Sequence, residues 1–147
     1  MKRNGLLFVL SAPSGCGKTT LAKKLIKSGI GINQSISMTT RSPREGEIEG
    51  KDYFFVKGAY FKKIISDRGF LEWTKNFGFF YGTPKRNIIN KIKKGKDTLL
   101  LIDVKGALLV KKLFKEAVLI FLLPPSLADL KKRLKVRNSD TAGEIER

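Results

Sequence analysis

The chain has no histidine, one cysteine and no long hydrophobic run, and each scarcity excludes a class of function. Without histidine, neither His-based acid–base catalysis nor a His-ligated metal site is possible. A single cysteine, Cys16, cannot form an intrachain disulfide, and a free thiol is typical of a reducing cytoplasm. No apolar run approaches the about 20 residues of a membrane span, and the run after Met1 is too short for a signal peptide. We therefore expect a cytoplasmic chain without a membrane partner.

Acidic residues are also scarce: 30 Lys and Arg face 13 Asp and Glu, which gives a formal net charge of +17. Such an excess is one indication of nucleic-acid binding. The basic residues are mostly lysines, however, and they are scattered in pairs along predicted helices. We interpret them as solvated side chains and expect no specific nucleic-acid partner. A nucleic-acid-binding protein remains an alternative that only the charge supports.

A glycine-rich turn near the N-terminus predicts a phosphate site. The apolar run 6–10 predicts a buried strand, and residues 18–28 predict a helix. In such a turn, backbone N–H groups and the helix N-terminus bind phosphate, Lys18 adds a positive charge, and Thr19 can place its hydroxyl on magnesium. The motif normally begins with glycine, where this chain has Ala12. We expect a nucleoside triphosphate to be bound by Ala12, Pro13, Ser14, Gly15, Cys16, Gly17, Lys18, Thr19 and Thr20.

The rest of the pattern predicts an α/β fold with a distinct middle. Continuous apolar strands (98–102 and 118–123) alternate with predicted helices (104–114 and 126–136, capped by Ser126), which indicates a parallel sheet covered on both faces. The middle instead resembles an inserted subdomain with a mixed or antiparallel sheet. It has short alternating stretches and one predicted helix, at 35–39, 53–56, 59–68 and 70–75. Of its apolar residues, we expect Phe70, Leu71 and Trp73 in the core.

The same middle region carries a second candidate site. Arg41 and Arg44 lie three residues apart, and arginine side chains are suited to a bidentate grip on phosphate oxygens. Tyr53 and Tyr81 supply hydroxyls farther along the chain. Glu72 stands among apolar residues, where burial without a partner would be unfavourable. A carboxylate is the natural acceptor for the two adjacent N–H donors of guanine, so these residues suggest a site for a nucleoside monophosphate.

Taken in order, these motifs resemble those of guanylate kinases, which transfer the terminal phosphate of ATP to GMP. The resemblance covers essentially the whole chain. It rests on the motifs SAPSGCGKT, SMTTRSPREGEIEGKDY, FLEW, YGTP, IDVKGA and PPSLADLKKRL. It implies a P-loop nucleoside monophosphate kinase fold, with a parallel core sheet flanked by helices. The core would comprise 1–33 and 94–124, the inserted GMP-binding subdomain 34–93, and an incomplete lid 125–147.

The resemblance also assigns roles to individual residues. The residues implied to bind GMP are Ser37, Arg41, Arg44, Tyr53, Glu72, Tyr81, Thr83 and Asp103. Glu72 and Thr83 would read the guanine, and the arginines, tyrosines and Ser37 would hold the phosphate. The implied catalytic residues are Lys18, Arg41 and Arg137, the last as a lid arginine. Mg²⁺ would accompany ATP beside Thr19 and Asp103.

Two departures from the family pattern leave alternatives open. Leu101 stands where the family commonly has a second acid, and the family continues for several tens of residues beyond 147. We therefore expect an uncovered strand edge and low stability and activity in a chain of this length. The alternatives are an inactive guanylate-kinase-like fragment or binding module, and a related kinase acting on a phosphorylated sugar. Lys18 and Thr19 argue against the first, and Glu72 with Thr83 against the second. The sequence does not indicate an oligomeric state.

Overall fold

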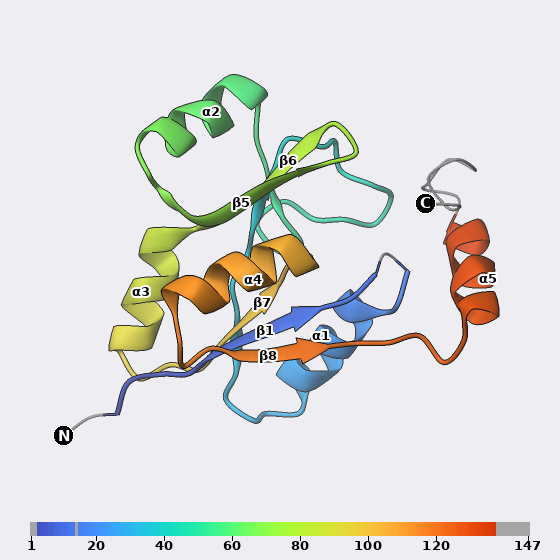
Figure 1. The fold of residues 1–147 in the computed structure, drawn as a ribbon, viewed down its shortest axis with the longest axis horizontal. Coiled ribbons are helices and arrows are strands. Elements are labelled where there is room, and N and C mark those ends of the chain that lie inside the picture. The colour runs from blue at the N-terminus through green and yellow to red at the C-terminus, as the bar shows by residue number, and fades with distance from the viewer. Residues whose placement is uncertain (1–2, 14, 138–147) are drawn as a thin grey trace.

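The structure is a computed structural model that describes residues 3–13 and 15–137, with residues 133–137 described by their backbone alone. It contains two four-stranded sheets and five helices within this range (Figure 1). The elements follow in the order β1 (Leu7–Ser11), α1 (Lys18–Lys27), β2 (Asn33–Gln34), β3 (Met38–Thr39), β4 (Phe54–Phe55), α2 (Gly58–Ser66), β5 (Phe70–Asn76), β6 (Phe79–Pro84), α3 (Lys85–Lys93), β7 (Thr98–Leu101), α4 (Val104–Leu113), β8 (Val118–Phe121) and α5 (Leu127–Arg137).

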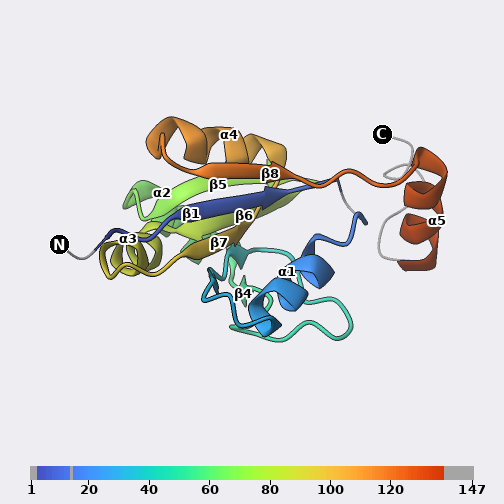
Figure 2. The same ribbon diagram turned by 90° about the horizontal axis from the view of Figure 1, so that it is seen from below.

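The first sheet is wholly parallel and has the strand order β2-β7-β1-β8. Its central strands β1 and β7 place successive side chains in two different cores. One core contains Val9 and Leu100 packed with residues of α3 and α4, whereas the other contains Leu10 and Leu99 packed with residues of α1. Figure 2 shows α4 and α1 on opposite sides of the sheet. The predicted parallel sheet with helices on both faces is confirmed.

Strand β8 forms one edge of this sheet among the described residues. Its four apolar residues are between 40% and 51% exposed, in contrast to the buried central strands. Beyond it, Ser126 caps α5: its hydroxyl oxygen accepts the backbone N–H of Asp129 at 3.0 Å and donates to that residue's carboxylate at 2.7 Å. The predicted N-cap is therefore confirmed. In Figures 1 and 2, α5 stands away from both sheets, past the carboxyl end of β8.

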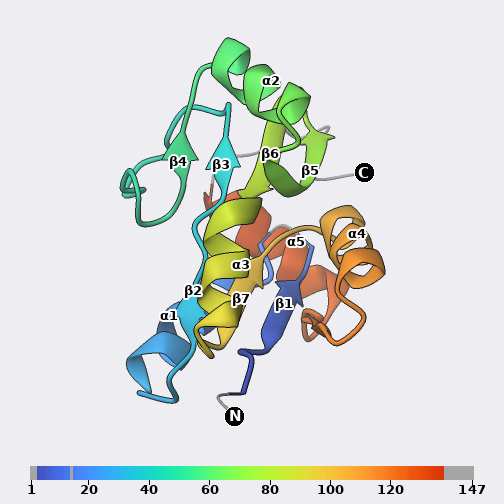
Figure 3. The ribbon, with the colours of Figure 1, turned by 90° about the vertical axis from the view of Figure 1, so that its left-hand side faces the viewer.

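The second sheet is mixed and has the order β4-β3-β6-β5, as the sequence pattern indicates for the middle of the chain (Figure 3). Helix α2 packs on it through Phe61, whose ring stacks on Phe70 at 4.4 Å and on Phe80 at 5.4 Å between centroids. A β-bulge at Leu71 breaks the pairing of β5 with β6. As a result, Phe70 packs on α2 while Leu71 packs in the core beneath α4. The bulge thus brings the following residues of β5 against α4.

Three features of the fold differ from the sequence-based expectations. Trp73 is 42% exposed and lies outside the core, because it alternates along β5 with the buried side chains of Glu72 and Thr74. Strand β6 was not predicted, since its hairpin turns at Phe77-Gly78 instead of a typical Asn-Gly pair; both residues have positive φ, 49° and 81°. Helix α3 was also missed, because it is rich in Lys and Asn and has no side-chain cap.

Candidate active site

A single cavity of about 890 Å³ unites most of the residues that the sequence singles out. It lies between the glycine-rich turn, the first turn of α1, the loop after β3, the facing side of β5 and the start of α4. The predicted residues that line it are Ala12, Pro13, Gly15, Cys16, Gly17, Lys18, Thr19, Thr20, Ser37, Arg41, Arg44, Tyr53, Glu72, Tyr81 and Asp103. Thr83 lies behind this wall, in contact with Glu72. Ser14 and the side chain of Arg137 lie outside the described residues.

The glycine-rich turn has the backbone geometry of an anion site. Gly15 and Gly17 adopt φ of 79° and 85°, values that glycine reaches without strain, and α1 begins at once with Lys18. No acidic residue lies in the first turn of α1, so the positive end of its dipole is not neutralised there. The Lys18 Nζ lies 3.3 Å from the carbonyl oxygen of Ile102, its hydrogen-bond acceptor at the end of β7. This arrangement suits a polyphosphate.

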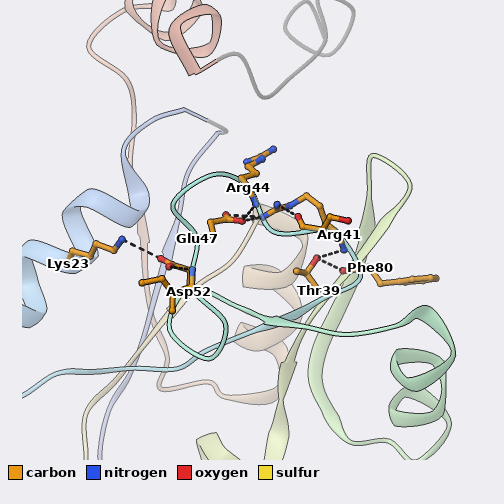
Figure 4. Close-up of polar contacts among 9 residues, drawn as sticks. Lys23, Thr39, Arg41, Arg44, Glu47, Asp52 and Phe80 are labelled. Atoms are coloured by element: carbon orange, nitrogen blue, oxygen red, sulfur yellow. Dashed lines mark hydrogen bonds and ion pairs between the residues drawn. The ribbon is translucent and has the colours of Figure 1, made fainter.

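The arginine pair is organised by Glu47, which the sequence analysis did not single out. The Glu47 carboxylate accepts two hydrogen bonds from Arg41 Nη2, at 2.9 and 3.0 Å, and one from the backbone N–H of Arg44 at 2.7 Å (Figure 4). Burial lowers the pKa of Arg41, but the hydrogen bond and charge of Glu47 outweigh it, so the pKa is raised. The Nε–H of Arg41 is buried without an acceptor among the described residues. Arg41 is therefore held as a fixed cation with donor capacity to spare.

Two tyrosines flank this cation. The guanidinium carbon of Arg41 lies 5.7 Å from the ring centroid of Tyr53, and the rings of Tyr53 and Tyr81 meet edge to face at 6.2 Å. Burial, with the nearby Tyr81, raises the pKa of the Tyr53 hydroxyl. Tyr53 therefore stays a neutral hydrogen-bond donor at physiological pH, which suits contact with an anion.

Two carboxylates, those of Glu72 and Asp103, also line the cavity. Glu72 is only 5% exposed, and the Thr83 hydroxyl donates to its Oε1 at 2.5 Å. The hydroxyls of Ser37 and Thr83 lie 3.3 Å apart, so Ser37 just before β3, Thr83 of β6 and Glu72 of β5 form one chain of hydrogen bonds. Burial, and to a lesser degree the charge of Asp103, raises the pKa of Glu72 from 4.5 to about 7, against the opposing Thr83 hydrogen bond.

Asp103 joins this part of the cavity to helix α4. As the N-cap of α4, its Oδ1 accepts the backbone N–H of Gly106 at 2.7 Å. Its Oδ2 accepts the Thr74 hydroxyl at 3.1 Å and the Asn76 side-chain amide. Thr74 and Asn76 were missed by the sequence analysis, although both line the cavity. The available signal was the alternation of polar residues at 72, 74 and 76, which places them on one face of a strand.

Comparisons with known proteins show the family to which this chain belongs. The sequence model of one family, described as guanylate kinase, matches residues 4–147. The chain belongs to the guanylate kinase family. It is 47% identical over 145 residues to the guanylate kinase of Caldanaerobacter subterraneus, covering 99% of this chain and 70% of that protein. It is 48% identical over 148 residues to the guanylate kinase of Wolbachia pipientis, covering 100% and 74%.

A solved guanylate kinase has the same fold. The crystal structure of guanylate kinase from Anaplasma phagocytophilum matches with a TM-score of 0.81 and 40% sequence identity, covering 99% of this chain and 73% of that one. The predicted P-loop nucleoside monophosphate kinase fold is thereby confirmed for this family member. Among the described residues, no helix is both long and apolar enough to cross a membrane. Within the same range, no cluster of three or more Cys, Asp or Glu side chains could hold a metal ion by itself.

Proposed function

We propose that this chain transfers the terminal phosphate of ATP to GMP, giving ADP and GDP. The observation that carries the proposal is the union of two unlike sites in one cavity. One side is a glycine-rich phosphate loop with Lys18, and the other is a buried carboxylate, Glu72, fixed by Thr83. A kinase for nucleoside monophosphates needs this pairing of a triphosphate site with a base-reading site.

The donor site is proposed at the glycine-rich turn. The N–H groups at the start of α1, together with Lys18, would neutralise the phosphates of ATP. Mg²⁺ would neutralise further charge on these phosphates when bound. Thr19, an exposed residue that lines the cavity, is the proposed ligand from the loop, and Asp103 would add charge nearby. Because the described residues form no metal cluster of their own, the nucleotide would supply other ligands, as is usual for Mg²⁺.

The acceptor site is proposed on the inserted sheet. Arg41, Arg44, Tyr53, Tyr81 and Ser37 would bind the GMP phosphate, with Arg41 already oriented by Glu47. At the other end, Glu72 would accept the two N–H groups of guanine. Adenine offers no such pair of donors, so this contact would select GMP over AMP.

Phosphoryl transfer requires the protein mainly to position the two nucleotides and to neutralise their negative charge. The phosphate of GMP is already an anionic nucleophile, so no general base is required, and the cations of the cavity would stabilise the transferring group. Arg137 ends α5, and its role as a lid arginine over that group is part of the proposal. The division into a core (1–33 and 94–124), a GMP-binding insertion (34–93) and a lid region (125–147) is likewise proposed.

We also propose a cytoplasmic place in purine nucleotide recycling, with ATP and GMP as partners and no specific nucleic acid. The buried Cys16, inside the phosphate loop and in no disulfide, is consistent with a reducing compartment. We disfavour a guanylate-kinase-like binding module, because Lys18 and Thr19 of the glycine-rich turn line one cavity together with the residues proposed to bind GMP.

The proposal is tested by the acceptor dependence of ADP release. ADP release from ATP should require GMP, and AMP should support less than a hundredth of the GMP rate. IMP, which lacks the exocyclic amino group, should be a poor acceptor, since it leaves one Glu72 contact unmade. Equal rates with GMP, AMP and no acceptor would refute the proposal.

A further inference from the structure

Two side chains of β5 converge on one oxygen of Asp103. The Thr74 hydroxyl lies 3.1 Å from Oδ2, and the Asn76 amide donates to the same atom. Neither residue was expected to take part in the site, yet both line the cavity together with Glu72 and Asp103. Thr74 is also buried, so its hydroxyl has little access to water as an alternative partner.

The two oxygens of Asp103 are therefore fixed by different elements. Oδ1 is held by α4 through the Gly106 N–H, and Oδ2 is held by β5 through Thr74 and Asn76. Hydrogen bonds to a carboxylate are stronger than those between neutral groups. With donors on both oxygens, the rotation of the carboxylate about its own axis is fixed as well as its location.

Glu72 lies close to the same helix end. A Cβ atom built on Gly106 would come within 2.7 Å of Glu72 Oε2 and 3.4 Å of Asp103 Oδ1. Two carboxylates therefore lie beside the first turn of α4, and the charge of Asp103 disfavours a charge on Glu72. The Thr74 hydroxyl and the Asn76 amide bind Asp103 Oδ2 and so hold this carboxylate against β5. They thereby oppose any displacement of Asp103 by the nearby Glu72.

We propose that Thr74 and Asn76 are positioning residues for GMP: by holding Asp103 Oδ2 against β5, they set the geometry of the carboxylate pair at the base end of the cavity. The inference rests on the proposed function, because it takes this end of the cavity to be the GMP site. Neither residue needs to touch the nucleotide for this role. Their loss is expected to weaken GMP binding. Binding of ATP without Mg²⁺, which is proposed to depend on the glycine-rich turn and Lys18 and not on Asp103, is expected to be unaffected.

A merely structural role makes a different prediction. If the network only ties β5 to α4, its loss should lower the melting temperature and affect both nucleotides alike. Thr98 provides a matched control, because it is a buried threonine of β7 whose hydroxyl donates to the backbone of Lys96, and it does not line the cavity. Thr98→Val removes one buried hydroxyl, as Thr74→Val does.

The test is calorimetric titration of the whole chain with GMP and, separately, with ATP in the absence of Mg²⁺, so that the proposed place of Asp103 beside the metal does not affect the comparison. Thr74→Val and Asn76→Leu should each weaken GMP binding about tenfold, the size expected for one lost hydrogen bond to a charged group, with ATP binding within twofold of the parent. Thr74→Ser keeps the hydroxyl and should restore GMP binding to within about threefold. Thr98→Val should lower the melting temperature and leave GMP binding unchanged.

Each outcome decides the inference. GMP affinity in Thr74→Val and Asn76→Leu equal to that of the parent would overturn it while leaving the proposed function intact. Equal weakening of GMP and ATP, or equal losses in Thr74→Val and Thr74→Ser, would also overturn it in favour of a structural tie. A parent chain that does not bind GMP at all would overturn the proposed function, and this inference with it.

Discussion

Replacing Glu72 by glutamine should stabilise the unliganded protein above neutral pH, although it removes the proposed guanine contact. Burial raises the pKa of this carboxyl from 4.5 to about 7 in the folded chain. Between these pH values the folded chain keeps a proton that the unfolded chain has released, so stability falls as the pH rises through this window. The difference between the two pKa values corresponds to about 3 kcal/mol, at roughly 1.4 kcal/mol per pH unit. Glutamine carries no charge and avoids this penalty.

The assay is thermal unfolding of both proteins without nucleotide at pH 5 and pH 8. For a chain of this size, each kcal/mol corresponds to about 2 to 4 °C in melting temperature. The melting temperature of Glu72→Gln should therefore exceed that of the parent by about 2 °C at pH 5 and by roughly 6 to 12 °C at pH 8. Its kcat/KM for GMP should fall by about two orders of magnitude, because part of an acceptor becomes a donor.

Glu47→Gln is the matched control, since it makes the same chemical change in the same cavity. Glu47 is paired with Arg41, whose side chain is only 10% exposed, so its loss leaves a nearly buried cation without its partner. This variant should be less stable than the parent at pH 8. The reasoning would be refuted if Glu72→Gln were no more stable than the parent at pH 8. It would also be refuted if the difference in melting temperature between variant and parent were the same at pH 5 and pH 8.

Three other changes test separate parts of the site. Lys18→Ala should abolish transfer while moving the melting temperature by less than about 3 °C, since a lysine at a helix N-terminus stabilises bound phosphate and not the fold; turnover near the parent rate would place the ATP site elsewhere. Gly106→Ala should lower kcat/KM for GMP at least tenfold by displacing Glu72, although alanine favours a helix by about 1 kcal/mol over glycine; unchanged GMP kinetics would show that the carboxylate adapts. Arg41→Lys should raise KM for GMP about tenfold or more and spare KM for ATP, because lysine cannot bridge Glu47 and a phosphate as a planar fork does; equal changes in both KM values would contradict its assignment to the acceptor site.

The parts of the fold that could be predicted from the sequence are those specified by local patterns. The strand before Ser11 and the helix at Lys18 follow from an apolar run, a glycine-rich turn and helical spacing. Ser126 was recognisable as a cap because serine is favoured at an N-cap and it stands directly before the predicted helix; in the structure its side chain accepts a backbone N–H three residues away. Strand β6 and helix α3 carry weaker local signals, and tertiary contacts, such as the burial of Ile88 beneath the sheet, stabilise them.

The site shows the same division. The phosphate loop and Arg41, Arg44 and Glu72 are recognisable by residue type and order. The pairing of Arg41 with Glu47 depends on a loop that turns back on itself, and the pairing of Asp103 with β5 joins residues 27 and 29 positions apart. Only the folded chain brings these groups together.

The most direct test of the central claim is to follow the phosphate itself. The chain is incubated with ATP labelled in its terminal phosphate, GMP and Mg²⁺, and the labelled products are separated over time. The account predicts that the label appears in GDP, that little appears as inorganic phosphate, and that AMP in place of GMP leaves the label in ATP. The account would be contradicted if the label were released mainly as inorganic phosphate. It would also be contradicted if AMP yielded as much labelled ADP as GMP yields labelled GDP.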